Sequence, residues 1–153
     1  MVAGAVMCVA PAACNTPSAG SSPPTPAQPA IEAMTFAPVL QLDIARFTRT
    51  RSGAYYRDLT LGTGAVAVMD RTVSVRYSIS LPDGTVVELQ NTAVDLTLGI
   101  DVIRGWREGV PGMKAGGVRT LIVPPSLGYG AKAHGPIPGQ STLIFEIQLL
   151  GVR

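Results

Sequence analysis

Residues 72–89 read TVSVRYSISLPDGTVVEL, and this stretch decides the fold class. Polar and apolar side chains alternate from Thr72 to Leu81, which is the period-2 pattern of a strand with one buried face. Pro82-Asp83-Gly84 then supplies a tight turn, because proline fixes φ and glycine accepts a positive φ. Residues 85–89 return as the partner strand. The stretch therefore predicts an antiparallel hairpin.

Two more strands and one short helix are predicted further along the chain. Val118–Val123 is rich in β-branched residues, and residues 142–150 alternate again between apolar and polar. Before both of them, residues 102–110 place apolar side chains on one helical face, and Gly105 and Gly109 limit the length of that helix. An antiparallel sheet folded over one short helix is an α+β architecture.

The composition of the 153-residue chain excludes several classes of function. The net charge is only +2 and no run of Lys or Arg forms a basic patch, which argues against nucleic acid as a partner. His134 is the one histidine, so a site with two histidine ligands is excluded, and no nucleophile motif stands near it. Gly62-Thr63-Gly64 lacks the third glycine of a dinucleotide fingerprint. We therefore expect no metal and no cofactor.

The predicted helix has the sequence VIRGWREGV at residues 102–110, which closely matches the signature V-I-x-G-W-x-E-G of the FKBP-type peptidyl-prolyl cis/trans isomerases. Four other segments resemble motifs of this family, in the family's order: Val75–Thr85, Met113–Gly117, Pro124–Ala131 and Ile137–Ile147. The resemblance covers residues 53–153 and implies a strongly bent antiparallel sheet wrapped around one short α-helix. It also implies proline-containing peptides and unfolded polypeptides as partners, bound in an apolar pocket that favours the twisted amide.

The resemblance further implies a site around the helix. Trp106 would form the floor of a proline pocket, Tyr129 would donate a hydrogen bond to a substrate carbonyl, and the Ile103 N–H would hold a second carbonyl. The positions implied to be catalytic are Tyr77, Trp106, Tyr129 and Phe145. The positions implied to bind substrate are Val87, Glu88, Val94, Asp101, Val102, Ile103, His134 and Ile137.

The chain departs from the family pattern at positions where the family has aromatic residues. Val87-Glu88 replaces the family's Phe-Asp, and Val94 replaces an aromatic residue at the start of the next strand. The connection between them is also shorter than in the small eukaryotic members. These differences predict a less aromatic pocket that binds macrolide inhibitors weakly. Two other functions stay open, a low-turnover peptide-binding chaperone or scaffold with the same fold, and a purely structural surface lipoprotein.

The segment before the domain has the composition of a leader and a linker. Residues 1–14 resemble a secretory signal that ends in a lipobox, with Cys14 as the lipidated residue. Residues 15–38 have the Pro, Ser and Ala content of a disordered tether, and residues 39–52 are interpreted as a linker that can form a local helix. This pattern predicts export to the periplasm or cell envelope, with a lipid anchor as the only membrane contact. A cytoplasmic low-complexity tail with an incidental cysteine is the alternative.

Overall fold

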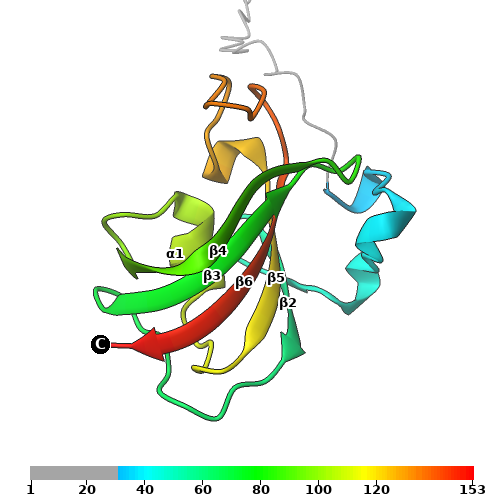
Figure 1. The fold of residues 1–153 in the computed structure, drawn as a ribbon. Helices are drawn as coiled ribbons and strands as arrows, with labels where there is room; N and C mark the ends of the chain where they lie inside the picture. The colour runs from blue at the N-terminus through cyan, green and yellow to red at the C-terminus, as the bar shows by residue number, and fades with distance from the viewer. Residues whose placement is uncertain (1–30) are drawn as a thin grey trace, which may run out of the picture.

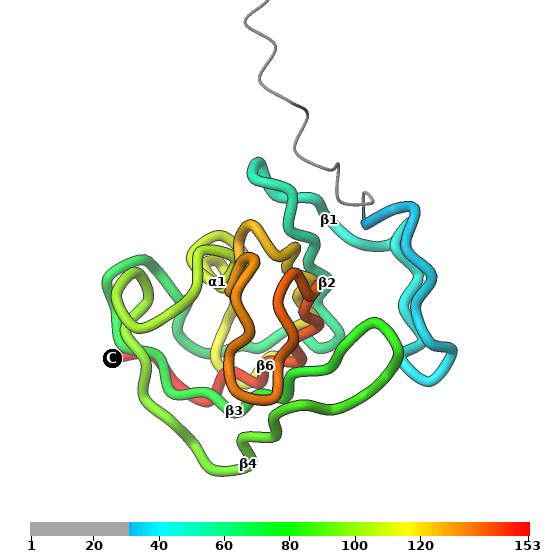
Figure 2. Tube along the Cα trace, turned by 90° about the horizontal axis from the view of Figure 1, so that it is seen from above, coloured from blue at the N-terminus to red at the C-terminus, as the bar shows by residue number. Residues whose placement is uncertain are grey.

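The computed structural model describes residues 31–153, and in them six strands pair antiparallel into one curved sheet (Figure 1). The strands are β1 (Thr48–Arg49), β2 (Tyr55–Thr60), β3 (Thr72–Ser80), β4 (Val86–Thr97), β5 (Val118–Val123) and β6 (Leu143–Val152). The helices are the α-helix α1 (Arg104–Gly109) and the 3-10 helices η1 (Ile31–Ala33), η2 (Pro38–Leu40), η3 (Ile44–Arg46) and η4 (Pro125–Leu127). The strand order is β1-β2-β5-β6-β3-β4, and the sheet curls around α1 (Figure 2). The predicted α+β fold is thus confirmed.

The hairpin of β3 and β4 forms at the predicted turn. The Leu81 N–H donates to the Thr85 carbonyl at 2.8 Å, and Asp83 Oδ1 accepts from the Thr85 N–H at 2.8 Å. Gly84 has a φ of 88°, a conformation that favours glycine. β4 continues well beyond the predicted end of the partner strand, because it stays paired with β3 over the full length of that strand.

The helix α1 lies close against the inner face of β5. A Cβ atom built on Gly105 would lie 2.6 Å from Val123 Cγ1, and one built on Gly109 would overlap the Leu121 side chain. Glycine at these two positions therefore allows the close approach. The helix is shorter than the predicted span because the chain is still extended at Ile103, where ψ is 160°.

Residues 31–47 form an arm on the outer face of the sheet, opposite α1 (Figures 1 and 2). Ile122 and Ile144 point to this face because side chains alternate along β5 and β6. The apolar residues that pack there, together with Tyr55, are Ile31, Met34, Phe36, Leu40, Leu42, Ile44 and Phe47. The structure therefore differs from the predicted tether over residues 31–38, because apolar side chains give this segment a face to bury.

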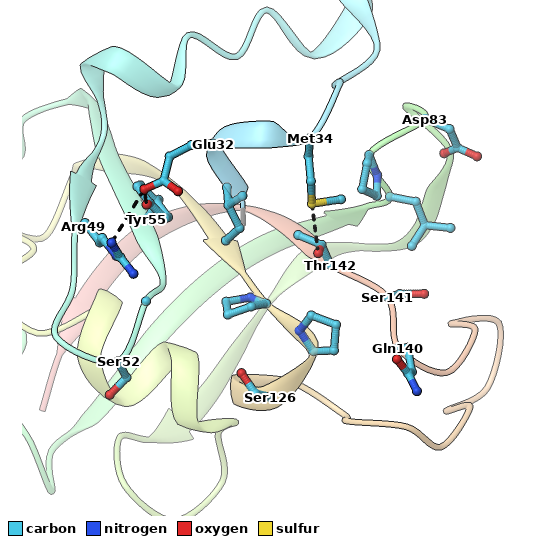
Figure 3. A pocket seen from close by; sticks show the side chains of 16 residues that line it. Glu32, Met34, Arg49, Ser52, Tyr55, Asp83, Ser126, Gln140, Ser141 and Thr142 are labelled. Atoms are coloured by element: carbon cyan, nitrogen blue, oxygen red, sulfur yellow. Dashed lines mark hydrogen bonds and ion pairs between the residues drawn. The ribbon is translucent and has the colours of Figure 1, made fainter. Parts of the chain in front are cut away.

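Polar contacts also fix the arm to the sheet (Figure 3). Glu32 accepts a hydrogen bond from the Tyr55 hydroxyl, and its carboxylate lies 3.7 Å from the Arg49 guanidinium. The Thr142 hydroxyl lies 3.4 Å from Met34 Sδ. η3 and β1 both fall in the segment predicted as a linker, and β1 pairs with β2, so the sheet begins inside that segment.

The predictions on the leader fall outside the described residues. They concern residues 1–30, which include the signal-like segment and Cys14. Both cysteines of the chain lie in that range, so residues 31–153 contain no thiol. In the described part of the chain, no helix is long and apolar enough to cross a membrane.

Candidate active site

A small cavity opens on the inner face of the sheet beside α1. Its volume is about 110 Å³, and its lining comes from β3, β4, β6, α1 and the loops next to them. The lining residues are Tyr77, Ile79, Leu96, Asp101, Val102, Ile103, Trp106, Tyr129 and Phe145. The structure thus brings together at one cavity the four residues that the sequence analysis names as catalytic.

Trp106 is the centre of an aromatic cluster in this cavity. Its side chain is buried, and its ring meets Tyr77 edge-to-face at a centroid distance of 5.4 Å. The Phe145 ring also meets the Trp106 ring edge-to-face, at a centroid distance of 5.5 Å, and both geometries are favoured by the ring quadrupole. Trp106 Nε1 is the buried side-chain polar atom in residues 31–153 that has no hydrogen-bond partner. The indole is therefore held in place by packing and by its helix, without a hydrogen bond of its own.

The Tyr77 hydroxyl is oriented by a carboxylate next to the cavity. It donates to Glu88 Oε1 at 2.8 Å. Burial, and in second place the Glu88 hydrogen bond, raises the pKa of Tyr77 to about 12. Burial also raises the pKa of Tyr129, and the charge of Glu88 acts in the same direction. Both phenols are therefore neutral hydrogen-bond donors at neutral pH. Glu88 itself does not line the cavity and acts through Tyr77.

Besides the Trp106 Nε1–H, the Tyr129 hydroxyl and the Ile103 N–H at the cavity have no hydrogen-bond partner within residues 31–153. The Tyr129 ring stacks on His134 with centroids 4.3 Å apart and planes 6° from parallel. His134 in turn exchanges backbone hydrogen bonds with Ile137 at 2.9 and 3.0 Å. His134 thus reaches the site through Tyr129, whereas Ile137 is buried in the core and does not line the cavity.

Val87 packs against the inner core but lies outside the cavity lining. Ile79 pairs with Glu88, whereas the next residue, Ser80, pairs with Val86. Val87 is therefore the extra residue of a β-bulge, which turns its side chain relative to a regular strand. Val87, which the family resemblance implies as part of a pocket wall, therefore does not line the cavity.

Val94 also packs against the inner core without lining the cavity. Leu96, which follows on the same face of β4, lines it instead, as does Ile79 on β3. Neither Leu96 nor Ile79 is among the predicted site residues, although Ile79 falls on the predicted buried face of its strand. Asp101 does line the cavity, and its Oδ2 accepts from the Thr97 N–H at 2.9 Å, which fixes the loop before α1.

A larger cavity of about 670 Å³ lies between the arm and the loop before β6 (Figure 3). Three prolines, Pro82, Pro124 and Pro125, form part of its lining. Its charged residues are already engaged, Glu32 with Arg49 and Tyr55, and Asp83 with the Thr85 N–H. Within residues 31–153, no group of three or more His, Cys, Asp or Glu side chains is placed to hold a metal ion. The smaller cavity has free hydrogen-bond donors beside the Trp106 ring. It is therefore the better candidate for the active site, despite its smaller volume.

Comparison with known proteins identifies relatives of this chain. Residues 64–150 match the family model of the FKBP-type peptidyl-prolyl cis-trans isomerases. An FK506-binding protein of Neisseria meningitidis serogroup B is 43% identical over 105 residues, which are 65% of this chain and 96% of that protein. FK506-binding protein 4 of Aspergillus oryzae is 40% identical over 104 residues, which are 66% of this chain but only 22% of that protein.

Solved structures show the same fold. The crystal structure of FkpA from Escherichia coli superposes with a TM-score of 0.66 at 32% sequence identity, covering 71% of this chain and 52% of that one. On its sequence motifs, its fold and its relatives, this chain belongs to the family of FKBP-type peptidyl-prolyl cis-trans isomerases.

Proposed function

We propose that this protein is a peptidyl-prolyl cis/trans isomerase that binds X-Pro segments in the inner cavity and favours their twisted amide. The observation that carries the proposal is the meeting of three groups at one small cavity. They are the buried indole of Trp106, the free hydroxyl of Tyr129 and the free N–H of Ile103. Membership of the family supports the same reaction.

The reaction needs no nucleophile. Rotation about a peptide bond has a barrier of about 18–20 kcal/mol because it breaks amide resonance. Unaided exchange at an X-Pro bond takes roughly tens to hundreds of seconds. A dry, apolar site disfavours the charge separation of the planar amide, and donors that fit the twisted state better than the planar one lower the barrier. Each tenfold acceleration requires about 1.36 kcal/mol of this preference.

The lining of the cavity matches these requirements. Trp106 and Phe145 supply apolar ring surface for the prolyl ring, and Tyr129 and Ile103 supply donors for carbonyl oxygens. The cavity of about 110 Å³ is well below the size of roughly 300–1,000 Å³ that holds a drug-sized ligand. It therefore suits a single prolyl ring, and we propose that macrolide inhibitors bind only weakly.

A protease-free assay of proline isomerisation tests this function directly. Exchange between the cis and trans forms of an Ala-Pro peptide is followed by NMR, with and without the purified protein. We expect catalysed exchange that depends on protein concentration. The competing function, a low-turnover peptide-binding chaperone or scaffold, is favoured by the valines at positions 87 and 94. It predicts binding of the same peptide with no acceleration, and that result would replace the isomerase proposal.

We further propose that the protein acts on proline-containing segments of exported polypeptides, held at the cell envelope through a lipid on Cys14. The support is the uncharged, signal-like residues 1–14 and their small residues before the cysteine. Bacterial lipoproteins carry more than one acyl chain, which stable anchoring requires. Mass spectrometry of the native protein should show an acylated Cys14 and no residues 1–13. Recovery of intact Met1 in a soluble fraction would contradict export.

A further inference from the structure

The inner face of β5 determines where α1 sits. Side chains alternate along a strand, so residues 119, 121 and 123 share one face. Val123 lies under the start of α1 and Leu121 lies under its end, each against a glycine of the helix. Arg119 is the next residue on that face, and it lies beyond the C-terminal end of the helix. A buried arginine therefore continues an apolar row that supports the helix.

Arg119 is fully engaged in a buried network, with 5% of its surface exposed. Its guanidinium donates to both carboxylate oxygens of Asp58 on β2, at 2.6 and 2.9 Å. The Nη1 group donates to the Gly109 carbonyl at 2.7 Å and makes a longer contact of 3.5 Å with the Pro111 carbonyl. The planar group also lies over the Tyr56 ring, 4.5 Å from its centroid. One side chain thus joins two strands to the end of α1.

The hydrogen bond from Arg119 to the Gly109 carbonyl acts on the C-terminal end of α1, where backbone carbonyls lack intrahelical partners. The last carbonyls of a helix have no intrahelical donor and carry partial negative charge, which a cation stabilises. α1 has only six residues, so Trp106 is within one turn of the Gly109 carbonyl. Because the indole has no hydrogen bond of its own, its ring is placed by the helix that carries it and by packing against Tyr77 and Phe145.

We propose that Arg119, oriented by Asp58, is a positioning residue that sets the height and tilt of Trp106 in the proposed proline pocket. The proposal rests on the isomerase function argued above. It goes beyond that function because Arg119 and Asp58 do not line the cavity. Arginine is required here because its planar fork bonds a carboxylate with two donors while a further N–H reaches the carbonyl. Lysine retains the charge but offers no such fork.

The test compares Arg119→Lys with Asp58→Asn and with a control, Arg153→Lys. Arg153 also pairs with an aspartate, Asp95 at 2.7 Å, but on the exposed surface. Folding of each variant is checked by circular dichroism and urea unfolding, at a temperature where every variant used is folded. The two readouts are kcat/KM for an Ala-Pro peptide and the fluorescence of Trp106, the only tryptophan in the chain. Fluorescence includes the emission maximum and quenching by acrylamide.

We expect folded Arg119→Lys to lose about tenfold in kcat/KM, which corresponds to about 1.4 kcal/mol. Its Trp106 emission should move to longer wavelength and quench more readily, while Arg153→Lys behaves as wild type. Asp58→Asn should change both readouts in the same direction and by less, because the bond to Gly109 remains. Wild-type emission and turnover in folded Arg119→Lys would overturn the proposal.

Two further outcomes are decisive. If Arg119→Lys does not fold, Asp58→Asn becomes the test, and wild-type readouts in it would assign the network to stability alone. If the wild-type protein shows no isomerisation, the proposed function fails, but the fluorescence readout still tests the positioning of Trp106. The failures of the two proposals are therefore distinguishable.

Discussion

The two faces of the sheet bury similar apolar side chains, which border a cavity on the inner face and the arm on the outer face. On the inner face, Leu121 and Phe145 belong to a core that encloses a cavity with free hydrogen-bond donors. On the outer face, their neighbours Ile122 and Ile144 are covered by the apolar residues of the arm. Alternate residues of β5 and β6 thus serve different purposes. The effect of a substitution should therefore depend on which face of the sheet the residue points to.

The largest effect is expected for stability on the outer face. Ile122 is completely buried between the sheet and the arm. Ile122→Ala should lower the free energy of unfolding by about 2–5 kcal/mol, because it removes buried methyl groups and leaves a cavity. Urea denaturation measures the loss. The kcat/KM of the folded fraction should stay within about twofold of wild type, and a larger loss in folded protein would break the separation of the two faces.

The converse is expected for the inner face. Trp106→Leu removes the proposed floor, and we expect kcat/KM for an Ala-Pro peptide to fall about tenfold or more, at least about 1.4 kcal/mol. Truncation of a buried Trp to Ala typically costs about 3–5 kcal/mol of stability, and Leu keeps part of that packing. The protein should therefore remain folded. Ile122→Ala is the matched control, with lower stability and retained turnover. Unchanged turnover in Trp106→Leu would remove the pocket assignment.

A smaller effect should separate two positions on β4. Leu96 lines the cavity, whereas Val87 sits in a bulge outside it. Leu96→Phe adds ring surface next to the bound proline and should raise kcat/KM about threefold, which corresponds to about 0.65 kcal/mol. Val87→Phe should change kcat/KM by less. The reverse order would show that the wall of the pocket is formed by Val87, as the family resemblance implies.

The smallest effect concerns alkaline pH. Burial raises the pKa of Tyr77 to about 12, above its ordinary value of 10.0, so the folded protein holds this proton more tightly than the unfolded chain. The resulting stability is complete below pH 10 and is lost as the pH rises toward 12. Urea unfolding from pH 8 to 12 should show wild type losing stability relative to Tyr77→Phe. Parallel curves would contradict a buried, neutral Tyr77.

Local patterns in the sequence were sufficient to predict much of the fold. The strand from Thr72 alternates cleanly, Val118–Val123 is rich in β-branched residues, and two glycines mark the helix, so β3, β5 and α1 could be located. β2 was not predicted, because YYRDLT has no alternation of polar and apolar residues and is fixed by its pairing with β5. Only residues 31–38 of the arm differ from the predicted tether, because the apolar residues there are spaced irregularly and acquire a common face only against the sheet.

The site could be predicted as far as motifs determine it. Trp106, Tyr77, Tyr129 and Phe145 meet at the cavity because the fold that the motifs specify brings their elements together. The β4 wall could not be predicted, because a bulge changes which residues face inward and is determined by pairing between strands. The role proposed for Arg119 also depends on distances between separate elements, for which no sequence motif gave a signal.

The central claim, that the inner face binds proline segments and the outer face is structural, is tested most directly by NMR titration. The single tryptophan gives one indole N–H signal in a ¹⁵N-labelled sample. Addition of an Ala-Pro peptide should shift the indole signal of Trp106 and the amide signal of Ile103, and an Ala-Ala peptide should not. Amide signals of the arm, such as those of Phe36 and Leu42, should stay in place. An unshifted Trp106 indole, or shifts concentrated on the arm, would contradict this account.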